Sequence, residues 1–119
     1  MRALVVEDDV NTVLLLSFLL EQLTFEVLTA ESVVSALGVL EGEQTIDLVV
    51  VDILLPGQPG SVLVNEMLLN YPQIPVLIVS AHVDMSGLEL GFSRFVPCLT
   101  KPFLNQQFRE TVRMLVKVP

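Results

Sequence analysis

The chain contains the stretch Leu48-Val49-Val50-Val51-Asp52, from which its architecture is easiest to derive. The first four residues are apolar and three of them are β-branched, a composition that favours a strand. An apolar run without polar alternation is typical of a parallel sheet that is covered on both faces. The run ends at an acidic residue. A short apolar strand with a polar residue at its carboxyl end is a pattern that recurs along the chain.

Four further runs predict four further strands. Residues 3–6 precede Glu7-Asp8-Asp9, residues 75–79 precede Ser80, and residues 95–99 precede Thr100-Lys101-Pro102. Residues 25–29 alternate between apolar and polar, as a strand at or near the edge of a sheet does. Pro97 lacks the N–H group that a central strand needs, so the fifth strand is expected at the border of the sheet.

Segments with helical periodicity separate these strands. Apolar residues recur at spacings of three and four in residues 11–23, 31–41, 61–71 and 104–117. This pattern predicts helices, of which Asp9 or Asn11 can cap the first and Ser61 the third. Residues 83–93 predict only a short or irregular helix, because each glycine inside a helix costs about 1 kcal/mol. The alternation predicts an α/β fold, an open doubly wound sheet flanked by about five helices.

Composition indicates one folded domain over residues 1–119. The hydrophobic fraction of 52% excludes disorder, and no apolar run approaches the roughly 20 residues that cross a membrane. No secretory signal is visible at the N-terminus. Cys98 is the single cysteine, which excludes an internal disulfide and is expected to be a small, semi-buried filler. A cytoplasmic location is therefore expected.

Charge is distributed unevenly. Fourteen acids and six bases give a net charge of −8, and residues 3–93 contain thirteen acids but no lysine or arginine. Residues 94–119 contain five bases and one acid. A nucleic-acid-binding domain needs a basic face, so we do not expect this chain to bind nucleic acid directly.

The polar residues that end the strands are candidates for a shared site. In open α/β sheets, ligands bind at the carboxyl ends of the strands, which would bring together Glu7, Asp8 and Asp52. Three neighbouring carboxylates repel one another unless a cation neutralises them, and oxygen ligands of this kind suit Mg²⁺. A soft metal is disfavoured, because Cys98 and His82 lie far apart in the sequence with no partner ligands nearby.

Four motifs in register resemble the receiver domain of bacterial two-component response regulators. They are Val5-Val6-Glu7-Asp8-Asp9, Val50-Val51-Asp52-Ile53-Leu54-Leu55-Pro56 with Gly60, Val79-Ser80-Ala81, and Thr100-Lys101-Pro102-Phe103. The resemblance covers essentially the whole chain. It implies a flavodoxin-like fold with a five-stranded parallel sheet in the order 2-1-3-4-5.

The resemblance also implies a role for each residue of the site. Asp52 would accept a phosphoryl group from a phosphohistidine on a histidine kinase or a histidine phosphotransfer protein. Mg²⁺ would be bound by Asp8, by Asp52, by the backbone carbonyl of Leu54, and by Glu7 through a water molecule. Ser80 and Lys101 would contact the phosphoryl oxygens, Ala81 would leave space beside them, and the peptide bond before Pro102 would be cis. The domain would catalyse only its own phosphorylation and dephosphorylation, and its conformation would control an output partner that the sequence does not name.

Two departures from the family pattern concern this output. The family often has Tyr or Phe three residues before its lysine, whereas this chain has Cys98. The family also usually has a regular fourth helix, whereas residues 83–93 contain Gly87 and Gly91. Both departures lie on the face that many receivers use for output, so an atypical switch is expected.

Two surface features of the predicted helices have different expected roles. On the first helix, Val13, Leu16, Leu19, Leu20 and Leu23 form the expected core stripe. This leaves Leu14 and Phe18 outside the core, and because the family uses this helix to dock its phosphodonor, both are candidate docking residues. On the last helix, the stripe of Arg109, Arg113 and Lys117 is expected to be a solvated face.

Three other functions compete with the phosphorylated receiver. A degenerate receiver that binds a partner without phosphorylation remains the main alternative, since Cys98 leaves it open. A phosphohydrolase resembling the haloacid dehalogenase group would need a second aspartate at the position of Leu54. A nucleotide- or flavin-binding domain would need a glycine-rich phosphate-binding motif, which this sequence lacks.

Overall fold

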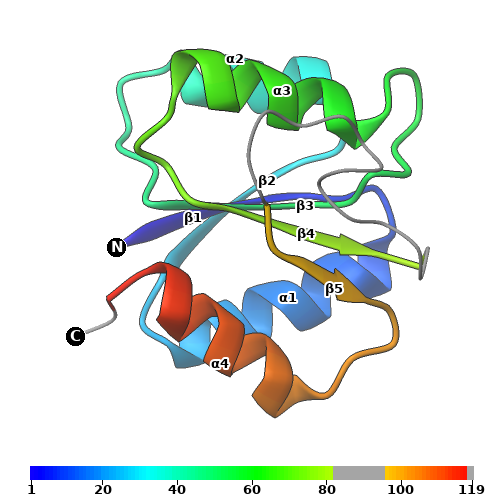
Figure 1. Cartoon of the computed structure of the whole chain (residues 1–119), viewed down its shortest axis with the longest axis vertical. Helices are drawn as coiled ribbons and strands as arrows, with labels where there is room; N and C mark the ends of the chain where they lie inside the picture. The colour runs from blue at the N-terminus through cyan, green and yellow to red at the C-terminus, as the bar shows by residue number, and fades with distance from the viewer. Residues whose placement is uncertain (82–95, 118–119) are drawn as a thin grey trace.

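The computed structural model describes residues 1–81 and 96–117 of the chain. In chain order the elements are β1 (Arg2–Val6), α1 (Val10–Gln22), β2 (Glu26–Ala30), α2 (Val33–Leu40), β3 (Leu48–Val51), α3 (Gly60–Asn70), β4 (Val76–Ser80), β5 (Cys98–Thr100) and α4 (Asn105–Leu115). Helices α2 and α3 cover one face of the sheet, and α1 and α4 cover the other (Figure 1). The fold is therefore the three-layer α/β arrangement that the sequence predicts.

All five strands are parallel and lie in the order β2-β1-β3-β4-β5, which confirms the predicted topology. The register pairs Val6 with Val51 and Val51 with Ile78. Strands β1 and β3 therefore end at the same level, so that Glu7 and Asp52 leave the sheet side by side. The Asp52 N–H donates to the carbonyl of Val6 at 3.0 Å, which fixes this level.

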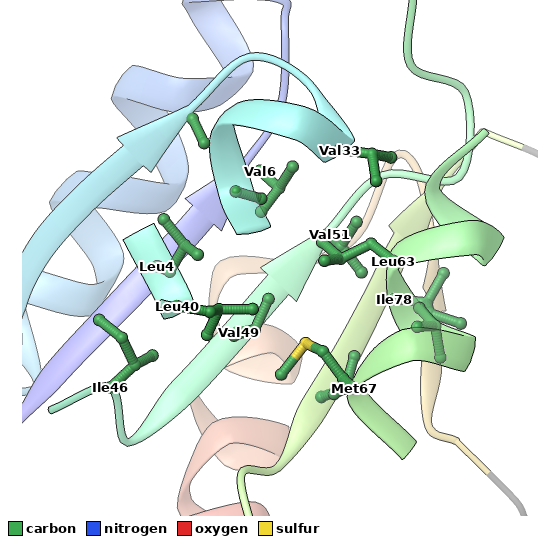
Figure 2. Packing of buried hydrophobic residues seen from close by; sticks show 14 of the residues in the cluster. Leu4, Val6, Val33, Leu40, Ile46, Val49, Val51, Leu63, Met67 and Ile78 are labelled. Atoms are coloured by element: carbon green, nitrogen blue, oxygen red, sulfur yellow. The ribbon is translucent and has the colours of Figure 1, made fainter. Parts of the chain in front are cut away.

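Two hydrophobic cores lie on opposite faces of the sheet. Successive strand residues alternate between them, as the pleat requires. Leu4, Val49 and Ile78 belong to the core beneath α2 and α3 (Figure 2), and neighbouring strand residues belong to the core beneath α1 and α4. Nearly continuous burial of β1, β3 and β4 explains why these strands read as uninterrupted apolar runs.

The predicted cap of the first helix is confirmed, and the cap of the third helix is wrong. Asp9 is the N-cap of α1, and its side chain accepts a hydrogen bond from the Thr12 N–H at 3.0 Å. Helix α3 starts at Gly60 with Pro59 as its N-cap, so Ser61 lies inside the first turn. The cap therefore lies two residues before the predicted one, where the Gly60 N–H donates to the carbonyl of Ile53 at 2.8 Å and holds the start of the helix against the preceding loop.

Helix α1 ends in a Schellman turn with threonine in the left-handed position. Thr24 has φ of 70°, its N–H donates to Glu21 at 2.9 Å, and the Phe25 N–H donates to Leu20 at 3.1 Å. This position usually holds glycine, because a Cβ is strained at positive φ. Leu20 and Phe25 are both buried in the core beneath α1, so packing holds the strained residue in place.

Both edge strands were expected, but the bounds of the last one are wrong. Strand β2 forms one edge of the sheet and β5 forms the other. The fifth strand was predicted over residues 95–99, whereas β5 covers Cys98–Thr100. Pro97 has no N–H to donate, although its carbonyl accepts from the Ile78 N–H at 2.9 Å, so regular pairing begins only after it.

The described residues form four helices, against the expectation of about five. The short or irregular helix expected at 83–93, together with Gly87 and Gly91, lies outside the described residues. Helix α4 ends at Leu115, two residues before the predicted end. In the described part of the chain, none of the helices combines the length and the apolar character that a membrane crossing requires.

Candidate functional site

Three charged side chains from distant parts of the chain meet at the carboxyl end of the sheet. The Lys101 Nζ donates to Glu7 Oε1 at 2.6 Å and to Asp52 Oδ2 at 2.8 Å. The Glu7 side chain is 2% exposed and the Asp52 side chain 9%. Glu7 follows β1, Asp52 follows β3 and Lys101 follows β5, so all three lie at the same edge of the parallel sheet. Lys101 contacts both carboxylates although β4 lies between β3 and β5.

The Asp52 carboxylate is held at both oxygens. Oδ2 accepts from Lys101, and Oδ1 accepts from the backbone N–H of Leu54 at 2.9 Å. The Leu54 side chain itself is 52% exposed. This residue therefore contributes its backbone to the site while its side chain lies at the surface.

The Glu7 carboxylate is held in the same way, by the start of α1. Its Oε2 accepts from the backbone N–H groups of Asp8 at 3.0 Å and Asp9 at 3.3 Å, and its Oε1 accepts from Lys101. Both carboxylate oxygens of Glu7 therefore accept hydrogen bonds from groups within the protein. The Asp8 side chain, in contrast, is exposed.

The pKa values in this cluster reflect its burial together with its charges. Burial raises the pKa of Glu7, the Lys101 hydrogen bond lowers it, and the charge of Asp52 raises it, so that the net shift is upward. Burial lowers the pKa of Lys101, but its hydrogen bonds to Asp52 and Glu7 outweigh burial and raise it overall. Lys101 therefore stays cationic, whereas ionised Glu7 is penalised mainly by its burial and further by the charge of Asp52.

The other predicted site residues surround this cluster. Ser80 ends β4 and is fully buried, and its carbonyl accepts from the Lys101 N–H at 2.7 Å. Ala81 follows it and is exposed. The peptide bond between Lys101 and Pro102 is cis, as the resemblance implies. The roles assigned to these residues in phosphate binding and metal binding remain predictions.

The donor set fits a hard divalent cation better than any softer metal. Two buried carboxylates share a single ammonium here, and carboxylate oxygens are ligands that hard cations prefer. Among residues 1–81 and 96–117, no three Asp, Glu, His or Cys side chains form a ready-made metal cage. Mg²⁺ typically takes one or two carboxylates from a protein and completes its shell with several waters.

Sequence reasoning missed two features of the site. It did not predict the direct bond between Lys101 and Glu7, and the roles assigned to the two residues, on phosphate and on a metal-bound water, stay predictions. It also missed the Leu54 N–H as a partner of Asp52, because a backbone donor has no signature in residue type. The complementary charges of Glu7 and Lys101 were the available signal for the first of these.

Comparison with known proteins identifies this arrangement. The family model for the response regulator receiver domain matches residues 3–113. The chain belongs to this family. Nearly the whole chain lies within the match, so the family accounts for the sheet and for every residue of the cluster.

Relatives of this receiver domain include the alkaline phosphatase synthesis transcriptional regulatory protein PhoP of Bacillus subtilis. It is 30% identical over 120 residues, which cover 98% of this chain and 48% of PhoP. The transcriptional regulatory protein CpxR of Escherichia coli K12 is 29% identical, with coverage of 98% of this chain and 49% of CpxR. The receiver domain thus spans about half the length of the relatives that it matches.

A solved structure agrees with the fold of the receiver domain. The response regulator TrrA of Thermotoga maritima, solved in complex with Mg(2+)-BeF, superposes with a TM-score of 0.81 at 28% identity. The superposition covers 97% of this chain and 98% of TrrA. The doubly wound sheet is therefore the common scaffold, and the TrrA structure contains Mg²⁺.

On the surface of the receiver domain, Leu14 and Phe18 are 63% and 56% exposed, as predicted from the core stripe of α1. A groove of about 140 Å³ runs beside Leu14 and reaches Glu7 and Asp8. The exposed apolar residues of α1 therefore begin beside Glu7 and Asp8 and continue away from them. Docking of a donor on this surface remains a prediction.

Cys98 and two of the three residues in the basic stripe take the positions that the sequence predicts, whereas Arg109 does not. Cys98 is half-buried on β5, packs against the core beneath α2 and α3, and burial raises the pKa of its thiol. Arg113 and Lys117 are exposed. Arg109 is half-buried and donates to Gln22 of α1 at 3.2 Å, so one member of the stripe joins two helices.

Proposed function

We propose that this receiver domain accepts a phosphoryl group on Asp52 from a phosphohistidine of a histidine kinase or a histidine phosphotransfer protein. The observation that carries the proposal is the 2.8 Å contact between Asp52 Oδ2 and the Lys101 ammonium. This contact places a nucleophilic carboxylate beside a cation that can neutralise the oxygens of an incoming phosphoryl group.

The transfer exchanges one bond to phosphorus for another. A carboxylate oxygen of Asp52 forms a bond to phosphorus as the bond from phosphorus to the histidine nitrogen breaks, and that nitrogen keeps the electron pair. The Leu54 N–H and Lys101 orient the carboxylate before the reaction. Lys101 then follows the developing negative charge, and Ser80 donates a hydrogen bond to a phosphoryl oxygen.

Mg²⁺ is part of the proposal. Asp8, Asp52 and the carbonyl of Leu54 would hold the ion directly, and Glu7 would hold it through a water molecule. When bound, the ion supplies positive charge to the transferring phosphoryl oxygens. Two buried carboxylates that share one ammonium support this assignment, because a further cation would neutralise the remaining negative charge.

Phosphorylation would control an output partner by shifting the receiver between two conformations. The chain would act on no other substrate and would catalyse only its own phosphorylation and dephosphorylation. We place it in the cytoplasm. The aromatic residue that many receivers use in the switch is replaced by half-buried Cys98, so the output response would rely on Ser80 and Lys101.

Any contact with DNA would be made by residues outside this chain. PhoP and CpxR are transcriptional regulatory proteins of about twice its length. Within these 119 residues, thirteen of the fourteen acids precede Arg94, and Arg2 is the only arginine or lysine before it. Such a distribution repels a polyanion, so a regulator of transcription that contains this domain would bind DNA elsewhere.

Donor docking on α1 has its own test. Leu14→Ser combined with Phe18→Ser removes apolar surface that the fold does not bury. Phosphotransfer from the cognate donor should slow by roughly tenfold or more, since each exposed anchor contributes about 1 kcal/mol or more to binding. Phosphorylation by acetyl phosphate, which needs no docking, should stay unchanged. Equal transfer from the cognate donor to variant and wild type would refute this surface.

One experiment separates the phosphoacceptor from its alternatives. The chain is incubated with Mg²⁺ and acetyl phosphate, and intact mass spectrometry counts the phosphoryl groups. Wild type should gain one, and Asp52→Asn should gain none. The absence of an adduct on wild type would favour the phosphorylation-independent binding module, which no contact among the described residues and none of the comparisons supports. Continuous release of phosphate would instead favour a phosphohydrolase.

A further inference from the structure

Gly60 contacts the backbone of the phosphoacceptor more closely than any side chain would allow. It is the first residue of α3 and is buried. A Cβ atom built on Gly60 would lie 2.1 Å from the carbonyl oxygen of Asp52, 2.9 Å from the Asp52 carbonyl carbon and 2.9 Å from the Cα of Ile53. All three are backbone atoms, so no side chain can rotate to make room.

Hydrogen bonds accompany the close approach of Gly60 to the Asp52–Ile53 backbone. The Gly60 N–H donates to the carbonyl of Ile53 at 2.8 Å, on the α3 side of the loop. On the sheet side, the Asp52 N–H donates to Val6 at 3.0 Å. The segment from Asp52 to Leu54 is therefore held from two sides, and its own Leu54 N–H fixes the Asp52 carboxylate at 2.9 Å.

We propose that Gly60 is a positioning residue for phosphoryl transfer to Asp52. Because Gly60 has no side chain, the start of α3 can lie directly against the Asp52–Ile53 backbone. This contact holds the Asp52 carboxylate at the position where it bonds Lys101. Any larger residue would push that backbone away by about 1.3 Å, the difference between 2.1 Å and the 3.4 Å at which ordinary contact begins. The inference rests on the proposed phosphoacceptor role of Asp52.

The size of the effect follows from the geometry of the site. Asp52 Oδ2 lies 2.8 Å from the Lys101 ammonium, and displacing it by 1 Å or more breaks this hydrogen bond. Misplacement of a reacting group by about 1 Å can cost on the order of 10²-fold in rate. We therefore expect Gly60→Ala to lower the rate constant for phosphorylation at saturating donor by about 10- to 100-fold.

Two control variants separate positioning from helix stability. Gly38 lies within α2, and a Cβ there would meet nothing within 4 Å, so Gly38→Ala makes the same chemical change without a clash. Val62 lies in the first turn of α3 and is partly exposed. Val62→Gly weakens the start of α3 without altering its approach to Asp52.

The test measures phosphorylation by acetyl phosphate and Mg²⁺ in time courses of intact mass, over a range of donor concentrations. Attack by Asp52 breaks the bond between phosphorus and the acetyl oxygen and releases acetate. Gly60→Ala should lower the saturated rate constant while the half-saturating donor concentration changes less than about threefold, because positioning acts on the reacting state. Gly38→Ala and Val62→Gly should stay within about twofold of wild type.

A second readout needs neither donor nor metal. In amide ¹H–¹⁵N spectra, Gly60→Ala should move the Leu54 N–H signal, which reports its bond to Asp52, and Gly38→Ala should leave it in place. If Gly60→Ala is too unstable to fold, it is repeated in the background of Thr24→Gly, which relieves a strained residue at the far end of α1. Failure to fold in that background as well would overturn positioning in favour of a purely structural role.

The remaining outcomes are distinguishable. If Gly60→Ala reacts as fast as wild type, or if Val62→Gly slows as much as Gly60→Ala, the positioning role is refuted while the proposed function stands. If wild type itself gains no phosphoryl group, the proposed function fails, and the positioning role fails with it.

Discussion

Replacing Lys101 by methionine removes the only ammonium that contacts Glu7 or Asp52 among the described residues. The two carboxylates are 2% and 9% exposed, and Lys101 is 22% exposed. Removing one partner from a buried ion pair costs about 3–5 kcal/mol, because the remaining charge stays buried without compensation. Since Lys101 retains some contact with water, we expect a loss of about 3 kcal/mol in the free energy of unfolding at neutral pH.

The loss should depend on pH through Glu7. The pKa of Glu7 is raised above its ordinary value of 4.5, and removal of Lys101 takes away the strongest contact that lowers it. The folded state then binds a proton more tightly than the unfolded state does, so stability falls as the pH rises above about 4.5. Lys101→Met should therefore be closest to wild type near about pH 5 and furthest from it near about pH 8.

Urea unfolding followed by far-ultraviolet circular dichroism measures these differences. Lys117→Met is the matched control, because this exposed lysine lies at the end of α4 away from the carboxylates, and its loss should change stability by less than about 0.5 kcal/mol. Adding Glu7→Gln to Lys101→Met should recover part of the lost stability near about pH 8. An equal loss at both pH values, or no recovery in the double variant, would refute the shared-cation account of this site.

Three further predictions concern single residues. Thr24→Gly should raise the free energy of unfolding by about 1 kcal/mol in urea titrations, because glycine adopts the left-handed φ of 70° without strain; a lower value would mean that the threonine is not strained. Phe108→Ala should cost about 3–5 kcal/mol, since this ring is fully buried and stacks on Phe103 with centroids 5.5 Å apart, and a loss below about 1 kcal/mol would contradict that packing. Glu7→Gln alone should flatten the decline in wild-type stability between about pH 5 and 8, measured by the same titrations, and an unchanged decline would exclude Glu7 as its source.

Much of the fold could be predicted because burial leaves a direct signature in residue type. Strands β1, β3 and β4 are nearly fully buried, so apart from half-buried Arg2 at the start of β1 their sequences contain no polar residue until the strand ends. The errors arose where backbone hydrogen bonds set a boundary. Pro97 delays pairing of β5, and the bond from Gly60 to Ile53 starts α3 before Ser61.

The site could be predicted in outline for the same topological reason. Glu7, Asp52 and Lys101 each follow a strand, and parallel strands bring their carboxyl ends together. Complementary charge indicated an acidic partner for Lys101, but it could not single out one partner among the several acids at this edge of the sheet. The geometry shows that it bridges Glu7 and Asp52, whereas direct binding of Mg²⁺ by Asp8 stays a prediction.

Strands β1 and β3 end at the same level, with Val6 opposite Val51. The site therefore forms only when these strands pair in the correct register. A slip of one residue along a strand moves a side chain by about 3.3 Å and turns it to the other face of the sheet. Glu7 and Asp52 would then no longer share Lys101. A misfolded copy with mispaired strands therefore lacks the site completely. Such a copy would be inactive, and it would not send a false signal.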